Sequence, residues 1–349
     1  MKIGVALGWQ NDDWDRYEAG DLQREPRIPD ARVFDDTKRL ALLLEPLGFD
    51  SMFCVEHHGS PHHMTPNPIT LLTYVAGATS KLEFGTCLVV LPWHHPLRVA
   101  EEFSLLDNLS GGRIACIGIG RGSAKREFDH FGIDIGTSRE RLAESTDILK
   151  QALTSPTISH HGTYWDIDDV AVRPGFRSRD LAEKVYAGVS ARASLEQAAH
   201  SGVRLILTQG KPVDESVDDV QRFNQIRAEH GWAPMRPIVA MPAYCAESEA
   251  EADEVAERAV GSYIDGLIHH YRIPAAEGAE LRKSRIEHAL SGTPEQVLEK
   301  SRYLAERLGT EHLVFMMSIG DMTPEETERS MRLLASRVLP ELRTTETPI

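Results

Sequence analysis

Residues 95–122, HPLRVAEEFSLLDNLSGGRIACIGIGRG, contain a helix, a turn and a strand in immediate succession. Apolar residues recur at helical spacing over Leu97–Leu109, and the pair Gly111-Gly112 then supplies a tight turn. The apolar run Ile114–Ile119 that follows is typical of a strand buried on both faces of a parallel sheet. This stretch therefore predicts an α/β fold built from parallel strands.

The same alternation continues along the 349-residue chain. Eight short apolar runs read as buried strands: Lys2–Leu7, Ser51–Val55, Leu82–Leu91, Ile114–Ile119, Lys184–Val189, Arg204–Thr208, Pro237–Cys245 and His312–Met317. Helical spacing follows them in Val33–Leu47, Pro68–Thr79, Leu97–Leu109, Ser138–Ala152, Ser194–His200, Val217–Glu229, Ser248–Val260, Pro294–Arg307 and Pro324–Leu339. Eight such units predict a (β/α)8 TIM barrel over residues 1–349 as a single domain, with an open doubly wound sheet as the alternative.

Three segments do not fit this alternation and are predicted to be loop insertions, near residues 8–29, 155–180 and 261–292. The first is polar with several aromatic and arginine residues, and the last contains Tyr263 and His269-His270-Tyr271. Because long connections inside a compact domain often form lids or binding loops, the first and last segments are candidates to border a site.

The bulk composition narrows the class of partner and the compartment. A net charge of −15 argues against nucleic acid or an anionic membrane as a partner. No apolar run approaches the ~20 residues of a membrane span, and the first residues lack a signal-peptide layout, so the expected location is the cytoplasm. The cysteines contain no CxxC pair and are expected to be free thiols: Cys54, Cys87, Cys116 and Cys245.

The second predicted strand runs directly into Glu56-His57-His58. Barrel enzymes place their chemistry at this end of the strands, where a histidine can act as a base or a donor near neutral pH. Adjacent strand residues face opposite ways, so His57 and His58 share one site only if the strand has already ended. A polar strand end with solvated imidazoles is an equally good interpretation.

Further histidines cluster in the same parts of the chain, namely His62, His63, His94 and His95. They raise the question of a metal site. The chain has neither an HxH on its first strand nor an HExxH motif, and no evident carboxylate ligand stands at later strand ends. The spacing therefore predicts no metal.

Glycines alternate at the end of the fourth predicted strand, in Gly118-Ile119-Gly120-Arg121-Gly122. A strand face without side chains lets a flat or phosphorylated ligand approach the backbone, and an arginine can pair bidentately with a phosphate. The next strand ends in Gly188-Val189-Ser190, and Ser194 opens the following helix as a second possible phosphate anchor. Close packing for the glycines and ordinary capping for the serine remain alternatives.

Together these segments resemble the bacterial luciferase-like family of flavin-dependent monooxygenases. The likeness runs in order through Gly48–His58 (GFDSMFCVEHH), Asn67–Arg113, Gly118–Gly122 (GIGRG), His161–Trp165 (HGTYW) and Gly292–Val297 (GTPEQV). The resemblance implies a (β/α)8 barrel with insertions that forms a homodimer. It also implies reduced FMN (FMNH2), supplied by a separate NAD(P)H flavin reductase, and O2 as co-substrate. A peroxyflavin would then transfer one oxygen atom to a small organic substrate.

The resemblance also assigns individual residues. His57 matches the family's catalytic histidine and His58 its neighbour. The cofactor contacts implied by motif position are Cys87 and Leu88 under the flavin ring, often at a non-proline cis peptide, Gly120, Arg121 and Gly122 at the phosphate, and Val189, Ser190 and Ser194 in a second phosphate segment.

Two departures from the family pattern stand out. The spacer Ile114–Ile117 is one residue longer than usual, which predicts a β-bulge. Gly120 stands where the catalytic subunit of luciferase has a cysteine, which argues against light emission. A deazaflavin-dependent hydride-transfer oxidoreductase, a metal-dependent hydrolase and a non-catalytic flavin-binding relative are the alternative functions.

Overall fold

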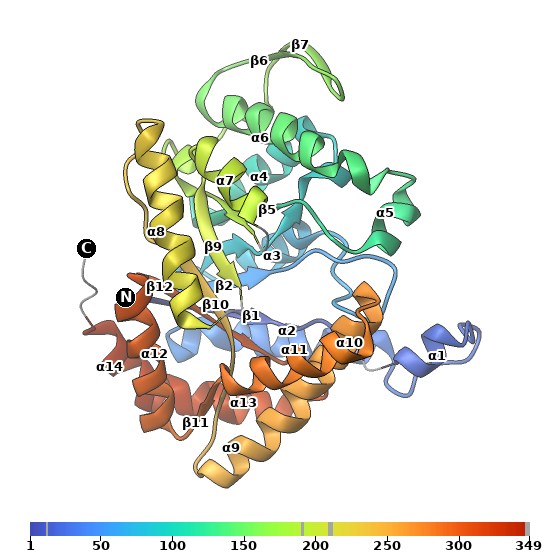
Figure 1. Ribbon diagram of the computed structural model, residues 1–349, viewed down its shortest axis with the longest axis vertical. Coiled ribbons are helices and arrows are strands. Elements are labelled where there is room, and N and C mark those ends of the chain that lie inside the picture. The colour runs from blue at the N-terminus through green and yellow to red at the C-terminus, as the bar shows by residue number, and fades with distance from the viewer. Residues whose placement is uncertain (12, 190–191, 209–211, 346–349) are drawn as a thin grey trace.

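The computed structural model places all eight predicted strands in one closed parallel sheet (Figure 1) and describes residues 1–11, 13–189, 192–208 and 212–345. The barrel strands are β1 (Lys2–Leu7), β2 (Ser51–Cys54), β3 (Glu83–Thr86) with β4 (Val89–Val90), β5 (Ile114–Gly120), β8 (Val185–Gly188), β9 (Arg204–Thr208), β10 (Ile238–Cys245) and β12 (His312–Met317). They neighbour one another in chain order, and β12 pairs with β1 to close the ring. The predicted (β/α)8 TIM barrel is confirmed.

Helices surround this barrel (Figure 1). They are α2 (Asp30–Leu47), α3 (Pro68–Ala76), α4 (Pro96–Ser110), α6 (Ser138–Thr154), α7 (Arg192–His200), α8 (Val213–Glu229), α12 (Pro294–Leu308) and α13 (Pro324–Leu333), which a π-helical turn (Leu334–Val338) joins to α14 (Leu339–Arg343). Thr293 and Thr323 close capping boxes at the starts of α12 and α13, each followed by a first-turn proline. These start signals explain why both helices begin where the sequence predicts.

The strands are apolar along their whole length because both of their faces are buried. In β12, Leu313 and Phe315 belong to the core between the barrel and its helices, whereas Val314 and Met316 belong to the core inside the barrel. Side chains of a strand alternate between its two faces, so successive residues enter the two cores in turn. The resulting pattern is a continuous apolar run without polar alternation.

The third barrel strand is interrupted at the point where the family resemblance places the flavin ring. The predicted run Leu82–Leu91 forms β3 and β4, and the Cys87–Leu88 peptide between them is cis. On the neighbouring strand, Phe84 pairs with Ile114 and Gly85 with Cys116, so Ala115 is an extra residue. The β-bulge predicted in this spacer is therefore confirmed.

The three predicted insertions contain regular structure rather than open loops. Segment 8–29 includes α1 (Trp14–Glu18), and segment 155–180 contains the antiparallel strands β6 (Ile158–His161) and β7 (Asp166–Val170). Segment 261–292 forms α10 (Gly261–Tyr271), α11 (Ala275–Glu287) and β11 (Leu290–Gly292), and a π-helical turn connects α10 to α9 (Glu249–Val255). Figure 1 shows α1, α10 and α11 on the same side of the barrel.

The contact between the first and third insertions is aromatic. The rings of Trp14 in α1 and His269 in α10 stack at a centroid separation of 5.4 Å. Among the described residues, no helix combines the length and the apolar character needed to cross a membrane.

Candidate functional site

The predicted site residues come from neighbouring strands of the barrel. His57 follows β2, Cys87 follows β3, Arg121 follows β5 and Val189 follows β8. These strands lie side by side in the order β2-β3-β5-β8, and all are parallel. Their carboxyl ends therefore meet at one end of the barrel, where enzymes with this fold carry their active sites.

The two histidines of the EHH motif belong to two separate groups. Strand β2 ends at Cys54, so Glu56, His57 and His58 already lie beyond the strand. His57 Nδ1 lies 3.2 Å from Glu127 Oε1, whereas His58 Nε2 lies 2.9 Å from Glu56 Oε1. The local fold thus gives each imidazole its own carboxylate.

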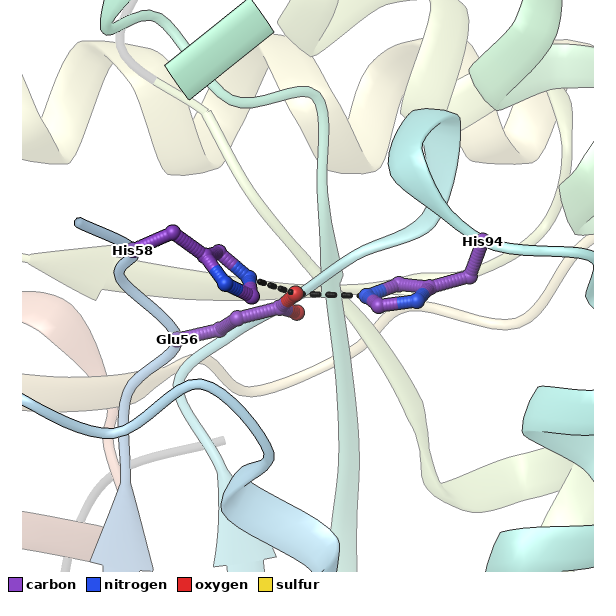
Figure 2. A group of neighbouring side chains, drawn as sticks. All are labelled: Glu56, His58 and His94. Carbon is purple, nitrogen blue, oxygen red and sulfur yellow. Dashed lines mark hydrogen bonds and ion pairs between the residues drawn. The ribbon is translucent and has the colours of Figure 1, made fainter. Parts of the chain in front are cut away.

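The first group consists of Glu56, His58 and His94, shown in Figure 2. Glu56 Oε1 accepts hydrogen bonds from His58 Nε2 and His94 Nε2, and Glu56 Oε2 accepts one from the Val90 amide at 2.7 Å. An ionised carboxylate only accepts hydrogen bonds, so both ring nitrogens carry the proton in this arrangement.

Hydrogen bonds keep the Glu56 carboxylate ionised. Burial raises the pKa of Glu56, but its hydrogen bonds to His58 and His94 outweigh burial and leave the pKa below its ordinary value. Burial lowers the pKa of His94, but Glu56 outweighs burial and leaves that pKa raised. Because Val90 lies in β4, the Glu56 carboxylate also ties the end of β2 to the interrupted third strand.

The second group is centred on Glu127 in α5 (Lys125–Phe131). Glu127 is buried, with 1% of its surface exposed. Glu127 Oε1 accepts the backbone N–H of His58 at 2.7 Å in addition to its contact with His57. Glu127 Oε2 lies 3.4 Å from Nε2 of His270 in α10. Burial raises the pKa of Glu127, but the contacts with His270 and His57 outweigh it and lower the pKa to about 2.

More histidines pack around this second group. The His62 ring lies 4.6 Å from the His57 ring and 4.8 Å from the His270 ring, centroid to centroid. His63 lies 4.7 Å from His62, and both residues are buried. Burial lowers the pKa of His62 and of His63 well below the ordinary value, so both imidazoles are neutral near pH 7.

Arg121 provides a cation at the end of β5. Its Nη1 donates to the hydroxyl of Ser138, at the start of α6, over 3.1 Å. Within the described part of the chain, Arg121 has no carboxylate partner. Burial lowers the pKa of Arg121, and the neighbouring cation Arg139 lowers it further. A partly buried guanidinium without a counter-ion is suited to hold a phosphate.

The glycines of the opening stretch accommodate the chain's own residues. A Cβ at Gly120 would lie 2.5 Å from Leu88 Cδ1, and one at Gly188 would lie 2.6 Å from the same atom. A Cβ at Gly118 would lie 1.9 Å from the Thr86 carbonyl oxygen. The side-chain-free face that the sequence suggests as a ligand approach is therefore occupied by the interrupted third strand. The contact of Gly120 with a cofactor stays a prediction.

The remaining predicted residues divide among different surroundings. Gly122 turns the chain after β5 with a φ of +72°, and Ser194 lies in the first turn of α7. Val189 directly follows β8, and Ser190 lies outside the described residues. His95 is exposed, with its ring 4.9 Å from Trp165, and belongs to neither histidine group.

Sequence reasoning missed Glu127 and Ser138, and it noted His270 only as part of an insertion expected to border a site. Each lies within or at the start of a helix, where a charged or polar residue normally signals only a solvated face.

Comparison with known proteins supports the family resemblance. A family model described as luciferase-like monooxygenase matches residues 1–312. The chain is 40% identical over 140 residues to the uncharacterized protein y4wF of Sinorhizobium fredii, covering 40% of this chain and 41% of the relative. It is 31% identical over 206 residues to the alkanal monooxygenase alpha chain of Photorhabdus luminescens, covering 59% of this chain and 57% of the relative. The matched part thus spans about half the length of these relatives.

Solved structures share the fold over nearly the whole chain. Monooxygenase RslO1 from Streptomyces bottropensis superposes with a TM-score of 0.84 at 24% identity, covering 98% of this chain and 100% of that one. The oxygenating constituent of 3,6-diketocamphane monooxygenase from Pseudomonas putida, in complex with FMN, superposes with a TM-score of 0.77 at 19% identity. This match covers 100% of each chain. The coenzyme F420-dependent tetrahydromethanopterin reductase of Methanopyrus kandleri superposes with a TM-score of 0.68 at 18% identity, covering 97% of this chain and 98% of that one. With the family model matching most of its length, the chain belongs to the luciferase-like monooxygenase family.

Proposed function

We propose that this chain is an FMN-dependent monooxygenase that oxygenates a small organic substrate with O2. Reduced FMN would come from a separate NAD(P)H-dependent flavin reductase. The observation that carries the proposal is the Arg121 guanidinium, which has no carboxylate partner among the described residues and lies at the carboxyl end of the barrel, next to the interrupted third strand. The diketocamphane monooxygenase constituent, which shares the fold, is in complex with FMN.

The residues around Arg121 fit the phosphate of FMN. Ser138 opens α6, a helix of 17 residues whose first-turn amides carry partial positive charge. Arg139 adds a second cation beside Arg121. A doubly charged phosphate would balance these cations, and Ser194 at the start of α7 is the second proposed anchor.

When bound, reduced FMN supplies the two electrons with which O2 is activated. His57 is the proposed proton-handling group. The Glu127 carboxylate accepts the Nδ1 proton of His57, which leaves Nε2 free to take up and return a proton. His57 is partly buried, with 15% of its side chain exposed. Cys87 and Leu88, at the cis peptide, are the proposed contacts of the flavin ring.

The cofactor proposal is tested by replacing Arg121 with methionine. Loss of a hydrogen bond to a charged group costs about 1.5–3 kcal/mol, so the dissociation constant for reduced FMN should rise by about 10- to 100-fold. Anaerobic fluorescence titration measures this constant. Arg98→Met is the matched control, because Arg98 is exposed on α4 and forms a surface ion pair with Glu102. Equal affinity of the two variants, or no binding of FMN by the wild type, would refute the proposal.

A deazaflavin is the second candidate cofactor, because an F420-dependent reductase shares this fold. The same titration with a deazaflavin decides between them: tighter binding of the deazaflavin than of reduced FMN would replace the monooxygenase proposal with hydride transfer. The substrate class is also open to test. A medium-chain alkanal is the first probe, since a relative is an alkanal monooxygenase alpha chain.

We also propose that the chain forms a homodimer through α3 and α4. Tyr74, Leu105 and Leu109 are 55%, 46% and 63% exposed on these two neighbouring helices. Leu105 and Leu109 lie one turn apart and form one apolar ridge. The double variant Leu105→Glu/Leu109→Glu should shift sedimentation from dimer to monomer. A monomeric wild type would contradict the proposal.

A further inference from the structure

The histidine group around Glu127 contains buried ring nitrogens without hydrogen-bond partners. Among the described residues, these are Nε2 of His62 and both ring nitrogens of His63, while Nε2 of His270 lies 3.4 Å from Glu127 Oε2 without good hydrogen-bond geometry. His62, His63 and His270 are only 3%, 4% and 1% exposed. A buried polar atom without a hydrogen-bond partner destabilises the fold. A cluster of such atoms beside an ionised, buried carboxylate is suited to bind a positively charged ligand.

We propose that His57, Glu127 and His270 bind a divalent transition-metal ion. Their ligand atoms all lie within 4.8 Å of one another. Tetrahedral ligands at 2.0–2.1 Å from Zn²⁺ are about 3.3 Å apart. His57 Nδ1 lies 3.2 Å from Glu127 Oε1, and His270 Nε2 lies 3.4 Å from Glu127 Oε2. Two of the three ligand separations therefore already match a metal site.

Outer contacts hold the ligands in place. His270 Nδ1 lies 3.0 Å from the Ser60 hydroxyl, which leaves Nε2 directed to the Glu127 side. The backbone N–H of His58 holds Glu127 Oε1 at 2.7 Å. Metal-binding histidines and carboxylates commonly have such partners on their second polar atom.

His62 is a candidate for a further ligand. Its ring packs against both the His57 and His270 rings, and its Nε2 has no partner among the described residues. Imidazole and carboxylate ligands favour Zn²⁺ and related first-row ions over Ca²⁺ or Mg²⁺, which prefer oxygen ligands. The sequence predicts no metal because its spacing hides this site: α5 and α10 bring Glu127 and His270 to His57 from distant parts of the chain.

The group of Glu56, His58 and His94 has the same composition but lacks this signal. Both carboxylate oxygens of Glu56 accept hydrogen bonds, and the two imidazoles donate to it through Nε2. Neither histidine has a buried ring nitrogen left without a partner. This group is already satisfied by internal hydrogen bonds and serves as an internal control. Metal binding is inferred without the flavin chemistry, but a metal bound through Nδ1 takes the place of the proton that His57 otherwise donates to Glu127, so metal binding and the proposed proton transfer are alternative states of this group.

Metal binding is tested on the full-length protein after treatment with a chelator. Calorimetric titration with ZnCl2 should show one equivalent bound per chain, and Co²⁺ should give the visible absorption of a tetrahedral site. His270→Ala and Glu127→Gln should each weaken Zn²⁺ binding by more than about 100-fold. Ser60→Ala removes the outer partner of His270, together with the hydrogen bond that Ser60 Oγ accepts from the His62 backbone N–H, and should weaken Zn²⁺ binding by about 10- to 100-fold.

His94→Ala is the matched control, since it removes one imidazole from the other group. It should bind Zn²⁺ as the wild type does, and circular dichroism checks that every variant is folded. The proposal is overturned if wild-type protein binds no Zn²⁺, if His270→Ala and Ser60→Ala bind it unchanged, or if His94→Ala abolishes binding. Failure of FMN to bind would leave these results unaffected, so the two proposals are tested separately.

Discussion

Replacing His57 with asparagine should lower the turnover of an alkanal probe by about 10²- to 10⁴-fold, the range contributed by a general acid–base group. Asparagine keeps a polar side chain near Glu127 but has no nitrogen that takes up a proton near pH 7. Affinity for reduced FMN should stay close to that of the wild type, because Arg121 lies on a different strand end. Stopped-flow oxidation with reductase-supplied FMN, followed by product analysis, measures the rate.

Two further variants separate a chemical role from a structural one. Glu127→Gln keeps the size of the side chain but removes the charge that accepts the His57 Nδ1 proton. Because Glu127 positions His57, the Glu127→Gln variant should have a lower kcat and a nearly unchanged KM. His95→Asn is the control, because His95 is exposed and belongs to neither histidine group. Unchanged turnover in His57→Asn, or an equal loss in His95→Asn, would remove His57 from the mechanism.

The barrel could be predicted from the sequence because its signals are local. Each buried strand is a short apolar run, and the extra residue before Gly118 appears in the structure as the bulge at Ala115. Motif resemblance placed Cys87 and Leu88 where the strand is interrupted by a cis peptide. The helices of segment 261–292 were not predicted, because that segment continues from α9 without a strand or a turn between them.

The candidate site could be predicted only in part. His57 and Arg121 lie in short motifs at strand ends, where the chain order alone brings them to the same end of the barrel. Glu127 and His270 carry no such signal, since a glutamate or histidine in a short helix is typical of a surface position. Their meeting at His57 depends on how α5 and α10 pack, which is a tertiary contact. The filling of the glycine-lined strand face by Leu88 is likewise a tertiary contact, which the sequence pattern does not reveal.

Metal-free protein should lose stability steeply as the pH falls below about 6.5, the ordinary pKa of histidine. The pKa values of His62, His63 and His270 are lowered in the folded state, so the unfolded chain takes up protons that the folded chain does not. Each such histidine removes about 1.4 kcal/mol of unfolding free energy per pH unit in this window. His62 and His63, whose pKa values lie well below the ordinary value, together give a slope approaching about 3 kcal/mol per pH unit below pH 6, and His270 adds to it.

The Glu127 carboxylate affects stability in a lower pH range. The pKa of Glu127 is about 2 in the folded protein against an ordinary value of 4.5, so its contribution is present above 4.5 and is lost as the pH falls toward 2. Urea unfolding between pH 8 and 5, with a chelator present, isolates the histidine window. His62→Phe keeps an aromatic ring that cannot be protonated. It should reduce the slope of unfolding free energy against pH by about 1.4 kcal/mol per pH unit, the contribution of one proton. A slope that is unchanged in this variant would show that His62 is already protonated in the fold, and a protonated His62 could not be the spare metal ligand of the Glu127 group.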